Sequence, residues 1–164
     1  MTVSFDKSIR DLAEFVRGAS RLAIVGVGSD IRGDDGAGVA VLRELRKKLG
    51  SGRALLVEGG VSPESVTGKL RKFSPSHVVL IDAADFGGVA GEIRVIEPDA
   101  ISGVSVSTHA MSLSILSEYI VRELGSKVIL IGIQPSHAGF KRRMSAEVSR
   151  SVSELATAVS RIIT

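Results

Sequence analysis

The chain has 164 residues, of which 44% are hydrophobic and 24% are charged, and it carries a formal net charge of +3. This length and composition indicate one folded domain, because the chain can bury one core and is too apolar for a disordered protein. The absence of cysteine excludes a disulfide framework, a thiolate metal site and a cysteine nucleophile.

Neither a membrane nor a nucleic acid is expected as a partner. The apolar runs are shorter than the ~20 residues of a membrane span, and the first residues lack the pattern of a signal peptide. The positive charges are scattered, which does not predict nucleic-acid binding. We therefore expect a cytoplasmic protein. The sequence has no Asn beside many Lys, Arg and Glu, a pattern typical of proteins from thermophiles.

The first predicted element is a helix over Asp6–Gly18, whose apolar residues fall on one stripe. We expect an extra helix that packs on the body of the protein, with binding to a partner as the alternative. Continuous apolar runs farther along predict strands that are buried on both faces of a sheet. These runs are Leu22–Val27, Ala54–Val57, Val78–Ile81 and Val128–Ile133.

Helical patterns separate these runs. Asp34–Leu49 is predicted to end before Gly50, and Pro63–Phe73 to begin with Ser62 as its N-cap. The charged and apolar residues of Glu92–Ile96 alternate, as in an edge strand. The alternation of strands and helices predicts an α/β fold with a mainly parallel sheet of about five strands. The last two helices are predicted over Met111–Leu124 and Ser145–Ile163.

A glycine-rich segment, Gly26–Gly38, follows the first predicted strand at the edge where sites form in open α/β sheets. Its glycine spacing and its Asp34-Asp35 pair argue against a dinucleotide site. A pyrophosphate would meet two carboxylates where that motif offers backbone N–H groups. A Rossmann-type nucleotide-binding module remains an alternative, with Glu58 as the acid that binds the ribose.

Three side chains near the predicted strand ends are candidates for a metal site. Asp34 is predicted to cap its helix, because Asp is favoured at the N-cap, and one helix start needs one cap. Asp35 is therefore the better site candidate. Asp82 ends the third run, with capping of the next loop as the alternative, and His109 precedes a predicted helix. Two carboxylates and one imidazole suit a divalent metal with open positions.

Several segments, in sequence order, resemble the [NiFe]-hydrogenase maturation endopeptidases. The similarity extends from about Leu22 to the C-terminus and includes the opening signature, the second signature and the histidine segment of that family. The segment Gly132–Pro135, with Gly139-Phe140 after it, is most similar to the subgroup that acts on formate-hydrogenlyase-type hydrogenases. The segments are Gly26–Ser29 with Gly33–Gly38, Leu80–Ala83, Ser107–Leu113, and Gly132–Pro135 with Gly139-Phe140.

The resemblance implies that the protein removes the C-terminal extension of a hydrogenase large-subunit precursor after nickel insertion. It implies a three-layer α/β/α sandwich, and we expect a single domain over residues 1–164. Residues 1–20 precede the segments that carry the resemblance and are expected to form an extra N-terminal helix. The resemblance assigns nickel contact and catalysis to Asp35, Asp82 and His109, with the nickel supplied by the substrate. Ser29 lies where the family usually has Asn.

The sequence offers no Ser-His-Asp or Cys-His nucleophile, so we expect an activated water to attack the peptide bond. Either Asp35 or Asp82 can be the base. The loop around Gln134-Pro135 and Gly139-Phe140 is expected to contact the folded substrate. A non-catalytic chaperone that checks for nickel is the second alternative function.

Overall fold

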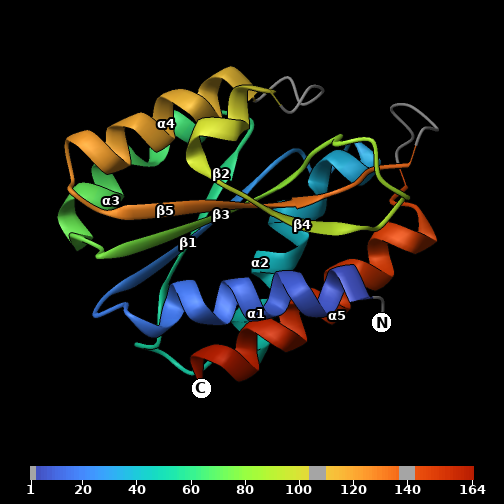
Figure 1. Cartoon of the computed structure of the whole chain (residues 1–164), viewed down its shortest axis with the longest axis horizontal. Coiled ribbons are helices and arrows are strands. Elements are labelled where there is room, and N and C mark those ends of the chain that lie inside the picture. The colour runs from blue at the N-terminus through green and yellow to red at the C-terminus, as the bar shows by residue number, and fades with distance from the viewer. Residues whose placement is uncertain (1–2, 104–109, 137–142) are drawn as a thin grey trace.

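A five-stranded sheet forms the middle layer of the computed structural model, which describes residues 3–103, 110–136 and 143–164 (Figure 1). The strand order is β2-β1-β3-β5-β4. Only β4 is antiparallel to its neighbour, and the other strands run parallel. The strands are β1 (Leu22–Val27), β2 (Leu55–Gly60), β3 (His77–Ala83), β4 (Ile93–Ile96) and β5 (Lys127–Ile133).

Helices cover both faces of the sheet, as Figure 1 shows, so the predicted three-layer α/β/α arrangement is confirmed. On one face lie α1 (Val3–Arg17), α2 (Ala37–Lys48) and α5 (Ala146–Ile163), and on the other lie α3 (Thr67–Phe73) and α4 (Ala110–Arg122). Among the described residues, three short 3₁₀ helices connect these elements: η1 (Gly33–Gly36), η2 (Pro63–Val66) and η3 (Pro98–Gly103).

The continuous apolar runs form strands because each face of the sheet has its own core. Neighbouring residues of a strand point to opposite faces. Ile24 of β1 therefore belongs to the core under α1, α2 and α5, and Val25 belongs to the core under α3 and α4. Every residue of β1 and β3 is buried, as a sheet covered on both sides requires.

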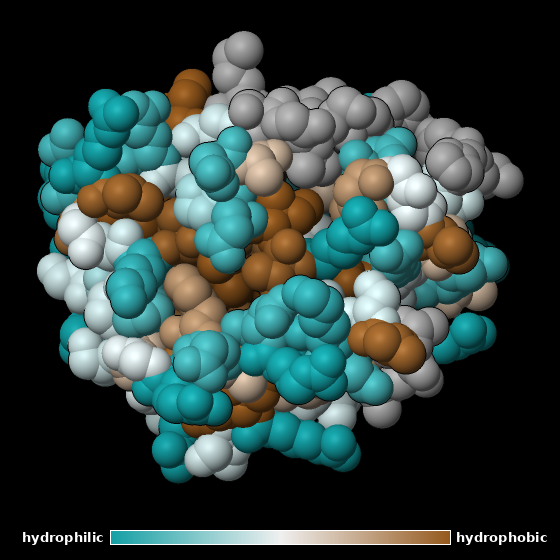
Figure 2. Space-filling model, in the orientation of Figure 1, coloured by the Kyte–Doolittle hydropathy of each residue, from teal (hydrophilic) through white to brown (hydrophobic). Residues whose placement is uncertain are grey.

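The predicted N-terminal helix is confirmed as α1, which packs against β4 and α5. Phe5 and Leu12 are buried on its inner side, and the Ser8 hydroxyl donates to the carbonyl of Ile93. The helix thereby covers an edge strand that would otherwise expose unpaired backbone groups. In the view of Figure 2, a large hydrophilic group lies over the middle of α1, and an apolar patch lies above it, in the region of β4 and β5.

Two predicted helix starts are wrong in detail. Asp34–Leu49 is divided into η1 and α2, and Pro63–Phe73 into η2 and α3. The Ser62 side chain makes no capping hydrogen bond. In both segments a tight 3₁₀ turn leads into the α-helix, so the chain completes an extra turn at the edge of the sheet. No helix among the described residues is long and apolar enough to span a membrane.

Candidate functional site

Glycines allow the start of α2 to lie directly on the ends of β1 and β3. A Cβ atom on Gly38 would come within 2.1 Å of the Ile81 carbonyl oxygen, and one on Gly28 within 1.8 Å of the Asp35 carbonyl oxygen. Gly28 also has a φ of 127°, which disfavours any side chain. This close packing explains the glycine-rich segment and brings η1 to the carboxyl edge of the sheet.

The two candidate carboxylates lie at this edge on adjoining elements. Asp35 is half-buried in η1, and its Oδ2 accepts a hydrogen bond from the Ser29 backbone N–H at 3.2 Å. Asp82 is fully buried near the end of β3, opposite Gly132 of β5. Because η1 packs against β3, the structure brings the elements of both residues together.

His109 lies outside the described residues, so its predicted role stays a prediction. Ala110, the next residue, begins α4, and the helix ends at Arg122, shortly before β5 begins at Lys127. The 13 residues of α4 span about 20 Å. The helix therefore returns the chain from the carboxyl edge to the amino edge, and its start faces the edge of Asp35 and Asp82. Within the described residues no group of three metal ligands gathers.

The prediction that Asp34 caps its own helix is wrong. Asp34 lies inside η1, and Gly36 is the N-cap of α2, without a side-chain hydrogen bond. The Asp34 carboxylate instead accepts from the backbone N–H groups of Ser136 at 2.9 Å and Ser145 at 2.7 Å, and from the Ser145 hydroxyl at 2.9 Å. These donors are 102 and 111 residues away, so no local pattern could have found them.

Gln134 organises the loop after β3, a role that the sequence did not reveal. Its Oε1 accepts from the backbone N–H groups of Phe86 and Gly88, both at 3.0 Å, and its Nε2 donates to Asp85 Oδ1 at 3.0 Å. The side chain is fully buried. The Gln134 side chain thus supports the loop after β3 from inside. The expected substrate contact of the loop around Gln134-Pro135 stays a prediction, and Gly139-Phe140 lie outside the described residues.

Comparisons with known proteins agree with this architecture. The family model described as hydrogenase maturation protease matches residues 39–162. The hydrogenase 3 maturation protease of Escherichia coli K12 is 35% identical over 127 residues, which cover 77% of this chain and 80% of the relative.

Solved structures extend the likeness to nearly the whole chain. The [NiFe] hydrogenase maturation protease HycI from Thermococcus kodakarensis is 36% identical, with a TM-score of 0.85, and the alignment covers 93% of this chain and 98% of that one. The endopeptidase HycI from E. coli is 31% identical, with a TM-score of 0.74, covering 84% and 87%.

The chain belongs to the hydrogenase maturation protease family. It is thus a peptidase, and the relatives confirm the predicted family and its formate-hydrogenlyase subgroup. This membership replaces both alternatives, the nucleotide-binding module and the non-catalytic chaperone. The family-model match begins at Val39, so the segment that carries Asp35 lies just before it.

In this protease Glu58 is part of an ion-pair network. Its Oε1 contacts Arg46 Nη1 at 2.7 Å and Arg43 Nε at 3.2 Å, and Arg43 also contacts Asp30 at 3.0 Å. The hydrogen bond from Arg43 lowers the pKa of the Glu58 carboxyl, and Arg46 adds to this effect. Glu58 therefore connects the end of β2 to α2, which is a structural role beside the candidate site.

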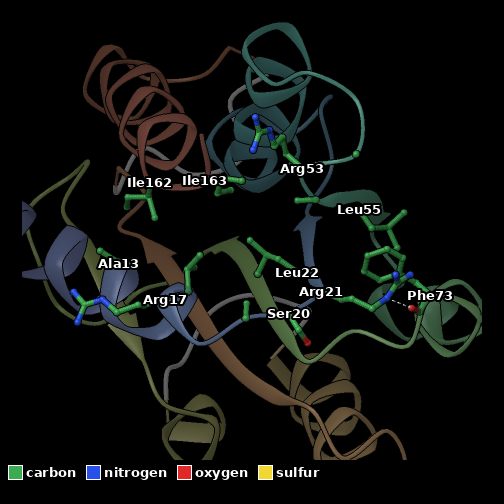
Figure 3. Close-up of a pocket in the computed structure, with 14 residues that line it drawn as sticks. Ala13, Arg17, Ser20, Arg21, Leu22, Arg53, Leu55, Phe73, Ile162 and Ile163 are labelled. Atoms are coloured by element: carbon green, nitrogen blue, oxygen red, sulfur yellow. Dashed lines mark hydrogen bonds between the residues drawn. The ribbon is translucent and has the colours of Figure 1, made fainter.

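A cavity of about 760 Å³ lies at the opposite, amino edge of the sheet (Figure 3). Leu22, the first residue of β1, lines it together with Phe73 and Arg21. Arg21 is held in place because its Nε donates to the Phe73 carbonyl at 2.9 Å, and its guanidinium lies 4.2 Å from the Phe73 ring centroid. This cavity of the protease is therefore separate from the edge that carries Asp35 and Asp82.

Proposed function

We propose that the protease removes the C-terminal extension of a [NiFe]-hydrogenase large-subunit precursor after nickel insertion, and that nickel in the precursor is the recognition element. The observation that supports this most directly is the junction of η1 with β3, which places Asp35 and Asp82 at one edge of the sheet. The likeness to the E. coli hydrogenase 3 maturation protease favours a client of the formate-hydrogenlyase type.

The proposed ligands are Asp35, Asp82 and His109. Two carboxylates and one imidazole are donors that a divalent nickel ion accepts, and the chain has no cysteine that could add a thiolate. Three such ligands bind free nickel only modestly. Docking of a precursor that already holds the ion raises its effective concentration at these residues. Nickel thus belongs to the substrate, and cleavage becomes a checkpoint on metal insertion.

The residues of the chain then act on a water molecule and the scissile peptide. Neither a cysteine nor a Ser-His-Asp arrangement is available as a nucleophile in the sequence, so water attacks the carbonyl carbon. One of the two carboxylates, Asp35 or Asp82, accepts the proton of that water. The proton then passes to the nitrogen of the leaving amine. We propose that this reaction occurs in the cytoplasm.

The test uses protease that has been stripped of metal and a large-subunit precursor with and without nickel. Mass spectrometry measures the shortening of the precursor. We expect cleavage only of the nickel-loaded precursor. Equal cleavage of both precursors would refute the checkpoint. Cleavage restored by zinc on the protease alone would indicate an ordinary metalloprotease.

A broad substrate range would also contradict the proposal. Recognition of a folded, metal-loaded partner leaves no need for a groove that accepts unfolded peptides. Casein should therefore remain intact during prolonged incubation with the pure protease. Rapid digestion of casein would show that nickel-dependent docking does not control access to the site.

A further inference from the structure

The carboxylate of Asp34 connects three segments that are distant in sequence. It lies in η1, after β1, and accepts hydrogen bonds from Ser136, just after β5, and from Ser145, just before α5. All three of its partner groups are donors: two backbone N–H groups and one hydroxyl. Such a set of donors requires an acceptor at both carboxylate oxygens.

Ser145 gives this connection a second function. Its hydroxyl oxygen accepts from the Val148 N–H at 3.4 Å and so caps α5, while the same hydroxyl donates to Asp34. The start of α5 is therefore held by a residue of η1. Because α5 packs against α2, which continues directly from η1, Asp34 adds a bond between two elements that already share a core.

Asp34 also precedes Asp35 in the same single turn. Asp35 Oδ2 accepts from the Ser29 N–H, so the two adjacent carboxylates hold the loop after β1 and the two ends of the β5–α5 connection. A shift of Asp34 would move the backbone of η1, and Asp35 with it. Asp34 and Asp35 are adjacent residues of this four-residue helix, so a change of the backbone at Asp34 also shifts Asp35.

We propose that Asp34 is a positioning residue for the cleavage reaction: its three hydrogen bonds fix η1, and thereby the direction of the Asp35 carboxylate. This inference rests on the proposed function of Asp35. Asp34 itself touches neither the nickel nor the peptide. The role requires a carboxylate, because an Asn side chain would turn an NH₂ group toward at least one of the three donors.

The test compares Asp34→Asn with Ser126→Ala. Ser126 is buried at the amino edge, where its hydroxyl donates to the Pro75 carbonyl, so S126A removes a buried hydrogen bond far from the site. We expect D34N to lower the cleavage rate at saturating nickel-loaded precursor by about tenfold or more, as the loss of groups that orient metal ligands typically does. S126A should be destabilised but cleave at the wild-type rate.

Amide hydrogen exchange, followed by NMR, reports the bonds themselves. The N–H groups of Ser136 and Ser145 should exchange faster in D34N than in the wild type. In S126A their exchange rates should be unchanged. If D34N does not fold, Ser145→Ala and Ser145→Thr test the same hydrogen bond to Asp34, because threonine keeps the hydroxyl that alanine removes. S145A should slow cleavage, and S145T should restore it.

Normal cleavage by D34N despite faster exchange would overturn the proposal, and so would an equal loss of rate in D34N and S126A. If D34N does not fold, unimpaired cleavage by S145A would have the same meaning. Failure of the wild type to cleave the nickel-loaded precursor is a different outcome, because it refutes the proposed function. Exchange at Ser136 and Ser145 would then still show whether Asp34 holds both segments.

Discussion

At the scale of single residues, the position of Asp82 is unusual for a charged side chain. It is fully buried near the end of a central parallel strand, where burial of a carboxylate costs free energy unless other groups compensate it. Residues of this kind cluster at functional sites. Asp35 lies in the neighbouring η1, so a second carboxylate at the same edge also indicates a functional site.

Replacement of Asp82 by Asn keeps the shape of the side chain and removes its charge. We expect D82N to be as stable as the wild type or more stable, because a neutral amide costs less to bury. Its cleavage rate should fall by about 10²–10⁴-fold, and H109A should lose activity similarly while remaining folded. Denaturant melts and precursor cleavage measure both effects, with Asp11→Asn on the exposed side of α1 as the control.

Two results would contradict this assignment. A D82N protein that does not fold would show that Asp82 is structural. Normal cleavage by both D82N and H109A would remove these residues from the reaction. The control D11N breaks only the exposed ion pair with Lys7, so it should match the wild type in stability and rate.

At the scale of elements, the fit of α2 against the sheet depends on close backbone approach. The start of this helix lies so near the ends of β1 and β3 that a side chain at Gly38 would meet the carbonyl oxygens of Val27 and Ile81. Ion pairs from Arg43 and Arg46 to Glu58 connect the same helix to β2. The helix that leads away from the site is thus fixed at its start by packing and along its exposed side by charge.

Gly38→Ala should destabilise the protein by about 1–3 kcal/mol or more, because backbone atoms cannot give way as a flexible side chain can. Gly68→Ala is the matched control. Gly68 lies in α3, and no atom beyond its chain neighbours and the backbone of its own helix lies within 4 Å of the added methyl group, so alanine should stabilise the helix by about 0.5–1 kcal/mol. Denaturant unfolding measures both changes, and equal effects of the two would contradict the packing argument.

Glu58→Gln should lower the free energy of unfolding by about 0.5 kcal/mol at pH 7, a small effect because the pair is partly exposed to solvent. Arg43 depresses the pKa of Glu58, so this contribution is present above the unfolded pKa near 4.3. It is lost as pH falls through the lower folded value. Urea melts of both proteins should therefore converge at acidic pH, and a constant difference across pH would exclude the ion pairs as the cause.

At the scale of the whole molecule, different features lie at the two edges of the sheet. The carboxyl edge carries Asp35 and Asp82, and the amino edge carries the cavity around Arg21 and Phe73. Helix α1 covers the outer strand β4 on one face. A folded partner that docks at the carboxyl edge would therefore leave the cavity at the amino edge uncovered.

The composition predicts a high melting temperature. The chain lacks Asn and Cys and has short connections between most elements, features that are frequent in thermophilic proteins. We expect a Tm above the ~45–65 °C range of mesophilic domains. Differential scanning calorimetry of the metal-free protein measures it, and a transition within the mesophilic range would contradict the prediction.

Local patterns of the sequence are sufficient to predict the layers of the fold. Continuous apolar runs specified buried parallel strands, and β1 agrees with the predicted run Leu22–Val27 at both ends. The charged and apolar alternation of Glu92–Ile96 identified the edge strand β4. Such patterns can be read locally. A strand buried on one face has an apolar residue at every second position, and a strand buried on both faces is apolar throughout. The resemblance of short motifs then gave the family and the candidate residues.

The roles of Asp34 and Gln134, by contrast, are visible only in the folded protein. Both interact with groups far away in sequence: Asp34 with Ser136 and Ser145, and Gln134 with the loop around Phe86. A capping rule considers the nearest N–H groups, and it therefore assigned Asp34 to its own helix. Hydrogen bonds between distant residues depend on which loops meet at one edge of the sheet. That depends on the order in which the strands pair, which no local pattern of the sequence specifies.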